Sequence, residues 1–191
     1  MSTQLVGRTL ARSQALQLLF QAEANGRTVE DVLSGDYALS DGPLDPYAER
    51  LALGADAARH DLDLVISSRA NAWSLSRMPA VDRNLLRLAL YEMLDVEEVA
   101  VPVTIDESVE LAKIYGTDDS YRFVNGLLGR VSDDIDAGVD IYEKAREATY
   151  GHEQEPEQEP EQEPEQEPEQ EPEPASVPEP ASAADEDVVG E

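Results

Sequence analysis

Residues 81–92 read Val81-Asp-Arg-Asn-Leu-Leu-Arg-Leu-Ala-Leu-Tyr-Glu92, and this stretch decides the fold class. Its apolar residues, continued by Met93 and Leu94, recur at the three- and four-residue spacing of one helix face. The spacing predicts a helix over residues 81–96. Because no segment of the chain shows the two-residue alternation of a strand, the sequence predicts an all-α protein.

Similar spacing predicts helices on the N-terminal side of this stretch. One covers residues 5–24 and stops at Asn25-Gly26, where glycine can adopt the left-handed conformation. A short helix follows over residues 29–33. A long one begins at Asp45-Pro46, with an acid that can cap and a proline suited to the first helical position, and runs to Ser68 or beyond.

On the C-terminal side, Thr104 and Glu107 have the spacing of a capping box, so we expect a helix to start there. The apolar run 99–103 resembles a strand, but it is isolated and Pro102 interrupts it. The predicted helix ends at Gly116. Another follows Asp118 or Asp119, with Gly126 and Gly129 allowing close helix approach, and a weak one covers residues 139–148. The total is about six or seven helices with short connections.

Residues 151–191 differ in composition from the rest of the chain. They repeat Glu-Gln-Glu-Pro five times over 153–172 and contain no Phe, Trp, Tyr, Leu or Ile, so we expect a disordered acidic tail. Residues 1–150 form one predicted helical domain. Removing the tail's 16 acids still leaves 26 acidic against 14 basic residues, a net charge of −12. Any nucleic-acid contact must therefore come from a local basic patch.

The composition leaves few routes to catalysis. There is no cysteine, and His60 and His152 are the two histidines. No phosphate-binding glycine loop, nucleophile elbow or zinc motif occurs, so we expect no enzyme, no metal and no cofactor. No signal peptide and no apolar run long enough for a membrane span is present, and the expected location is the cytoplasm.

Residues 81–92 and two further stretches together resemble the NusB family. The second stretch is Val101-Pro-Val-Thr-Ile-Asp-Glu-Ser-Val-Glu-Leu-Ala-Lys-Ile-Tyr-Gly116, and the third is Ser120-Tyr-Arg-Phe-Val-Asn-Gly126. The opening Ala11-Arg-Ser-Gln-Ala-Leu-Gln-Leu-Leu-Phe20 is also similar to the family's first helix. The resemblance covers about residues 7–135, and the order and spacing of the motifs make it specific.

This resemblance implies a fold of two packed three-helix groups and a function in transcription antitermination. Members of the family pair with the small-subunit ribosomal protein that doubles as NusE. The pair binds boxA RNA and joins an antitermination complex on RNA polymerase, above all in ribosomal RNA operons.

The resemblance also implies an RNA-binding surface. Positions that match the family's RNA-binding residues hold Arg8, Arg12, Phe20, Arg83 and Arg87. Thr9 and Leu10 stand at positions that are often basic in the family, so the predicted RNA-binding surface of this chain has fewer cations. Four of the candidates have a structural alternative: Arg12 can pair with an acid while its stem packs, Phe20 can be a core or rim aromatic, and Arg83 and Arg87 can pair with Asp82 or Glu92.

Asp82, Asp119 and Phe123 match family positions that contact the ribosomal protein. Phe123 can also be partly core, and Asp119 can simply cap its helix. Trp73 matches a family aromatic that we expect to pack.

Two alternatives remain open. The first is a protein-only scaffold that binds the ribosomal protein or itself and has little RNA affinity alone; a homodimer could hide the RNA surface. The second is that the acidic tail competes with RNA for the basic patch, instead of merely aiding solubility.

Overall fold

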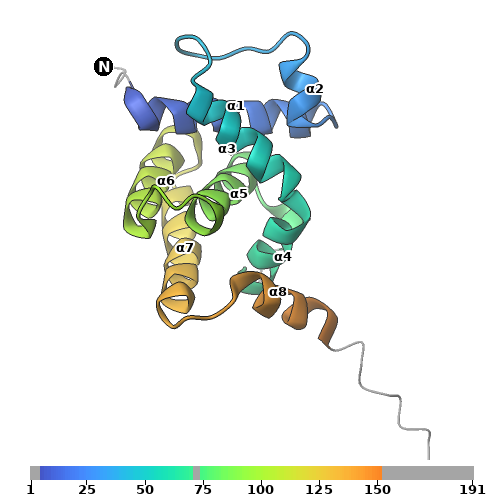
Figure 1. Ribbon diagram of the computed structural model, residues 1–191, viewed down its shortest axis with the longest axis vertical. Coiled ribbons are helices and arrows are strands. Elements are labelled where there is room, and N and C mark those ends of the chain that lie inside the picture. The colour runs from blue at the N-terminus through green and yellow to red at the C-terminus, as the bar shows by residue number, and fades with distance from the viewer. Residues whose placement is uncertain (1–4, 71–73, 152–191) are drawn as a thin grey trace, which may run out of the picture. The chain divides into compact units, whose positions relative to one another are not determined.

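The computed structural model describes residues 5–70 and 74–151. These residues form eight α-helices and one short 3-10 helix, η1, without any strand, which confirms the all-α class (Figure 1). The elements are α1 Gly7–Ala24, α2 Val29–Leu33, α3 Pro46–Ala57, α4 Arg59–Arg69, η1 Leu75–Arg77, α5 Ala80–Asp95, α6 Val101–Tyr115, α7 Ser120–Asp136 and α8 Ile141–Tyr150. Trp73 and the tail after residue 151 lie outside the described residues, so the predicted division at residue 150 stays a prediction.

Six of the eight helices gather into two groups of three, and α5, a member of the second group, also contacts the first. Helices α1, α2 and α3 contact one another, and so do α5, α6 and α7. Helix α5 also packs against α1, α3 and α4, and α8 lies along α4 (Figure 1). Residues 81–92, near the centre of the sequence, therefore lie on the helix that touches both groups. None of the helices in the described ranges combines the length and apolar composition needed to cross a lipid bilayer.

Three helix starts are capped by side chains, and the one at Asp45-Pro46 was predicted from the sequence. Asp45 caps α3 by accepting a hydrogen bond from the backbone N–H of Tyr47 at 2.7 Å, and Pro46 takes the first helical position. Helix α2 begins with a capping box between Thr28 and Asp31. At the other end of the domain, Asp140 caps α8.

The predicted long helix from Asp45 to Ser68 is wrong, because the chain breaks at Ala58 into α3 and α4. Ala58 has φ −86° and ψ 6°, which turns the chain without a proline or glycine. Buried residues continue at helical spacing on both sides of the break, such as Ala55 and Leu62. Because two consecutive helices bury similar faces, their combined pattern resembles that of one helix, and the helix count rises to eight.

The predicted capping box at Thr104 is also wrong. Helix α6 starts three residues earlier, at Val101, and Pro102 lies in its first turn, where a missing N–H breaks no helical hydrogen bond. Thr104 is instead buried inside the helix, and its hydroxyl donates to Glu92 Oε2 at 2.7 Å. The proline that argued against a strand therefore marks a helix start.

The core runs through both groups and contains the apolar faces predicted for α1, α5 and α7. The largest fully buried side chains are mostly leucines, among them Leu18, Leu19, Leu85, Leu86, Leu127 and Leu128.

The predicted close approach at Gly126 and Gly129 is wrong, since a Cβ at Gly126 would meet only an arginine Nη1 3.9 Å away and one at Gly129 nothing within 4 Å. The close approach is at Gly54 on α3, where a Cβ would lie 2.0 Å from Tyr91 Cζ of α5.

Candidate nucleic-acid and partner interface

Helix α1 carries two of the predicted RNA-binding cations, and their side chains differ in exposure. Arg8 is exposed, and its guanidinium lies over the Tyr47 ring, 4.9 Å from the centroid. Arg12, one turn later, has a side chain only 4% exposed. Of the two cations on α1, Arg8 alone presents its charge to solvent.

Arg12 belongs to a buried network centred on the Glu92 carboxylate of α5. Its Nε donates to both carboxylate oxygens of Glu92, at 3.0 and 2.9 Å, and Nη1 reaches Glu107 of α6 at 3.3 Å. The alternative that Arg12 pairs with an acid is therefore what the structure has. Contact between Arg12 and RNA stays a prediction, and it would require the guanidinium to leave these acids.

Two hydroxyls complete the shell around Glu92. Tyr47 of α3 donates to Oε1 at 2.5 Å, and Thr104 of α6 donates to Oε2. Burial raises the pKa of the Tyr47 hydroxyl, and its hydrogen bond to the Glu92 carboxylate raises that pKa further. One carboxylate on α5 thus ties together α1, α3 and α6.

A second network engages Arg83 and Arg87. Arg83 pairs with Glu23 at the end of α1 and donates to the backbone oxygens of Leu75 and Met78, both at 2.8 Å. Arg87 bonds Glu23 at 2.6 Å and both oxygens of Asp63 on α4 at 2.7 and 2.8 Å.

These partners are not Asp82 or Glu92, the neighbours that the sequence suggested, but acids on other helices. Burial alone would raise the pKa of Glu23, but its hydrogen bonds and charge interactions with Arg83 and Arg87 outweigh this and lower it. Both arginines are mostly buried, so their RNA contacts stay predictions.

Phe20 lies on the other half of α1, about 18 Å from Arg8 at the rise of an α-helix. Its side chain is 42% exposed, a rim position, and it lines a cavity of about 240 Å³. The other lining residues come from α1, the first turn of α5 and the last residue of α6: Leu16, Gln17, Gln21, Val81 and Tyr115. We call this cavity the Phe20 hollow. Its wall is mostly apolar.

Asp82 follows Val81 and sits next to the start of α7. Its side chain is buried, Oδ1 has no hydrogen-bond partner, and burial raises the pKa of the carboxyl. A hydrogen bond from Ser120, the first residue of α7, counteracts part of that shift. This contact brings the first turns of α5 and α7 together.

The other two predicted partner residues lie at that same start of α7. Asp119 holds the N-cap position, but its side chain makes no capping hydrogen bond, is 87% exposed and pairs with Arg122 at 3.4 Å. Phe123 is partly buried against the core, as one alternative predicted. Phe20 therefore shares a cavity with Val81 of α5, and Asp82 and Asp119 lie at the starts of α5 and α7, whereas Arg8 lies at the opposite end of α1 from Phe20.

The comparisons with known proteins agree with this architecture. A family model described as the NusB family matches residues 9–133. The chain belongs to the NusB family. A curated relative from Salinispora tropica, "Transcription antitermination protein NusB", is 46% identical over 129 residues, which are 66% of this chain and 95% of the relative. The protein of that name from Saccharopolyspora erythraea is 44% identical, covering 65% and 86%.

Solved structures share the NusB fold. T. maritima NusB superposes with a TM-score of 0.60 at 36% identity, over 69% of this chain and 94% of that one. A crystal structure of antitermination factors NusB and NusE in complex with dsRNA superposes with a TM-score of 0.55. At 24% identity, over 66% and 96% of the two chains, this second likeness shows the fold alone.

Sequence reasoning missed the acids that hold the NusB arginines. Glu23 was not singled out as a partner, and Glu92 was suggested for Arg83 and Arg87 instead of Arg12, although Glu92 lies at helical spacing from Leu85 and Leu88 on a buried face of α5. An acid on the apolar face of one helix and an arginine on the apolar face of another together indicate a buried ion pair. Among residues 5–70 and 74–151, no three His, Cys, Asp or Glu side chains lie close enough to hold a metal ion.

Proposed function

We propose that this NusB protein is a transcription antitermination factor that binds boxA RNA together with a NusE-type small-subunit ribosomal protein. In this proposal the pair joins an antitermination complex on RNA polymerase and promotes processive transcription of ribosomal RNA operons. The names of the relatives support the antitermination role, and the NusB–NusE–dsRNA structure, which shares the fold, supports the two kinds of partner.

The observation that carries the proposal is the Phe20 hollow with the start of α7 beside it. The exposed aromatic ring and the apolar wall form a surface that a protein partner can cover. The apolar wall suits a protein side chain, so we assign Phe20 to the protein partner. Stacking of Phe20 on a base is the competing role.

The RNA surface is proposed around Arg8, at the other end of α1. A single exposed arginine on this helix neutralises few phosphates, so the affinity for RNA should be low without the partner. The ribosomal protein then supplies the remaining cations. This division places protein docking and RNA binding at opposite ends of α1.

A protein-only scaffold is the second candidate, and one observation favours it. Three of the four predicted RNA-binding arginines, Arg12, Arg83 and Arg87, already pair with carboxylates inside the domain. In the self-associating version of this candidate, a homodimer covers the RNA surface. Sedimentation of a monomer at micromolar concentration rules that version out.

The test measures binding of the full chain to boxA RNA and to a scrambled RNA of equal length, with and without the NusE-type protein. Preference for boxA, strengthened by the partner, supports the antitermination factor. Capture of the ribosomal protein without any RNA binding by the pair supports the scaffold. Failure to bind either partner contradicts the antitermination factor and leaves the self-associating scaffold, which sedimentation tests.

A further inference from the structure

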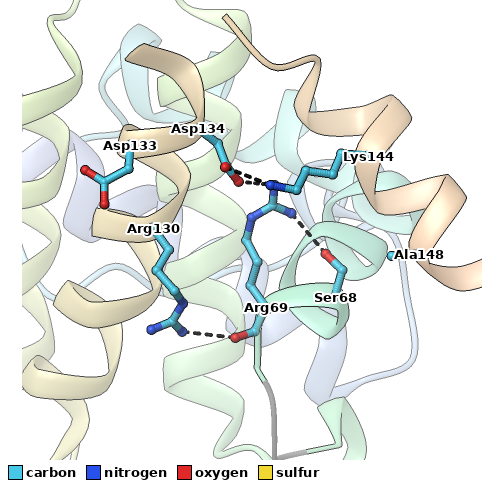
Figure 2. A pocket seen from close by; sticks show the side chains of 7 residues that line it. All are labelled: Ser68, Arg69, Arg130, Asp133, Asp134, Lys144 and Ala148. Carbon is cyan, nitrogen blue, oxygen red and sulfur yellow. Dashed lines mark hydrogen bonds and ion pairs between the residues drawn. The ribbon is translucent and has the colours of Figure 1, made fainter. Parts of the chain in front are cut away.

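A cavity on another part of the domain is left unused by the proposed function. It has a volume of about 340 Å³ and lies where α4, α7 and α8 meet (Figure 2). Three of its lining side chains are cationic and two are acidic: Arg69, Arg130 and Lys144, with Asp133 and Asp134. The lining is therefore net positive in a domain whose net charge is −12. We call it the α4–α8 pocket.

Arg69 is the buried cation of this pocket, with a side chain only 7% exposed. Nη2 donates to Asp134 Oδ2 at 2.9 Å and Nη1 to the Ser68 hydroxyl at 3.0 Å, but Nε has no acceptor. A buried donor without a partner costs about 1–3 kcal/mol, so such groups commonly mark the place of an unoccupied acceptor. Figure 2 shows the stem of Arg69 between Arg130 on one side and Ser68 and Lys144 on the other.

Arg130 supplies the most available charge. It lies on α7, is exposed, and makes one hydrogen bond, from Nη2 to the backbone oxygen of Arg69 at 3.0 Å. No carboxylate of the described residues lies within ion-pair distance of its guanidinium, because Asp134 is already held by Arg69 and by Lys144 Nζ at 2.7 Å. Its Nε and Nη1 donors thus remain for a ligand at the mouth of the pocket.

We propose that the α4–α8 pocket binds a phosphate group, either as free inorganic phosphate or on a small nucleotide. Arg130 donates to the phosphate oxygens in the forked geometry that guanidinium offers, and Lys144 adds charge from α8. Arg69 contributes the third positive charge, and its Nε has no acceptor among the described residues. Asp133, at the rim, opposes the anion and limits its affinity.

The experiment titrates the full chain with inorganic phosphate and, separately, with uridine monophosphate, by calorimetry at constant ionic strength. The main variant is Arg130→Gln, and its matched control is Arg122→Gln, which removes an exposed arginine from the same helix. Asp133→Asn removes a negative charge from the rim of the pocket and should strengthen phosphate binding, with Asp136→Asn as its control. Thermal unfolding of every variant checks that the fold is retained.

We expect saturable binding that Arg130→Gln weakens at least about tenfold, that Asp133→Asn strengthens several-fold, and that both controls leave unchanged. Equal affinity for the two ligands identifies the free ion as the occupant, and binding of uridine monophosphate alone identifies a nucleotide. The proposal is overturned when neither ligand saturates below roughly 10 mM, or when the controls shift the affinity as much as the pocket variants do.

Discussion

The Glu92 network and the Phe20 hollow lie along the same helix, α1, yet they differ in almost every property. Around Glu92 an arginine, a tyrosine and a threonine from three helices saturate one buried carboxylate. The Phe20 hollow has an exposed ring, an apolar wall and a neighbouring carboxyl oxygen that no donor reaches. In this protein the charges of α1 and α5 mainly hold helices together, and an apolar surface is left for a partner.

The largest expected effect comes from breaking the Glu92 network. Glu92→Ala leaves Arg12 buried with the longer, 3.3 Å pair to Glu107 as its remaining ion pair, so we expect a loss of about 3–5 kcal/mol in the free energy of unfolding. Urea denaturation measures it. As the control, Glu98→Ala removes the exposed pair with Arg50, where we expect a much smaller loss because solvent screens the two charges. A Glu92→Ala loss as small as that of the control would contradict the structural role of the network.

The second prediction tests the Phe20 hollow. Phe20→Ala should weaken binding of the NusE-type protein by about thirtyfold, because an exposed aromatic anchor at the centre of an interface contributes about 2 kcal/mol. Isothermal titration calorimetry measures the affinity. Tyr150→Ala removes a ring of similar exposure on α8 and should leave the affinity unchanged. If Phe20→Ala instead weakens only RNA binding, the ring belongs to the RNA surface.

The third prediction compares the pH dependence of two carboxyls. The pKa of Glu23 is lowered in the folded state. Its contribution to the free energy of unfolding is therefore present at a pH above the ordinary pKa of 4.5, and it is lost as the pH falls through the lower folded pKa. The pKa of Asp82 is raised in the folded state, so wild type should gain stability as the pH falls through that value toward 3.8.

Unfolding across the acidic range therefore separates the two variants. Relative to Glu23→Gln, wild type should lose stability as the pH falls, and relative to Asp82→Asn it should gain stability. If the stability difference between wild type and variant changes with pH in the same direction for both variants, one of the two environments is misassigned.

The smallest expected effect concerns Arg8. Arg8→Ala should lower the salt dependence of RNA binding by the NusB–NusE pair by about one phosphate contact, with a stability change below about 1 kcal/mol. Filter binding over a salt series gives the slope. Arg146→Ala, which removes a half-exposed arginine on α8, should leave that slope unchanged. If it changes the slope as much as Arg8→Ala does, the RNA responds to the overall electrostatic field of the domain and not to a local contact with Arg8.

The sequence by itself determined the helical class, most helix ends and the family. These features depend on residues close together in the chain: the spacing of Leu85, Leu86 and Leu90, the cap at Asp45 and the stop at Asn25-Gly26. The exceptions, at Ala58 and Thr104, are places where packing between helices outweighed a local signal.

Only the tertiary structure decided which arginines remain free. Arg8 and Arg12 lie one turn apart and look alike in the sequence, but within the described residues only Arg12 forms an ion pair, with Glu92, 80 residues away. The same holds for Glu23 with Arg83 and Arg87, and for the α4–α8 pocket, whose lining comes from three helices. A buried ion pair forms only when both partners are brought within about 3 Å, and that distance depends on how whole helices pack, which local spacing does not encode.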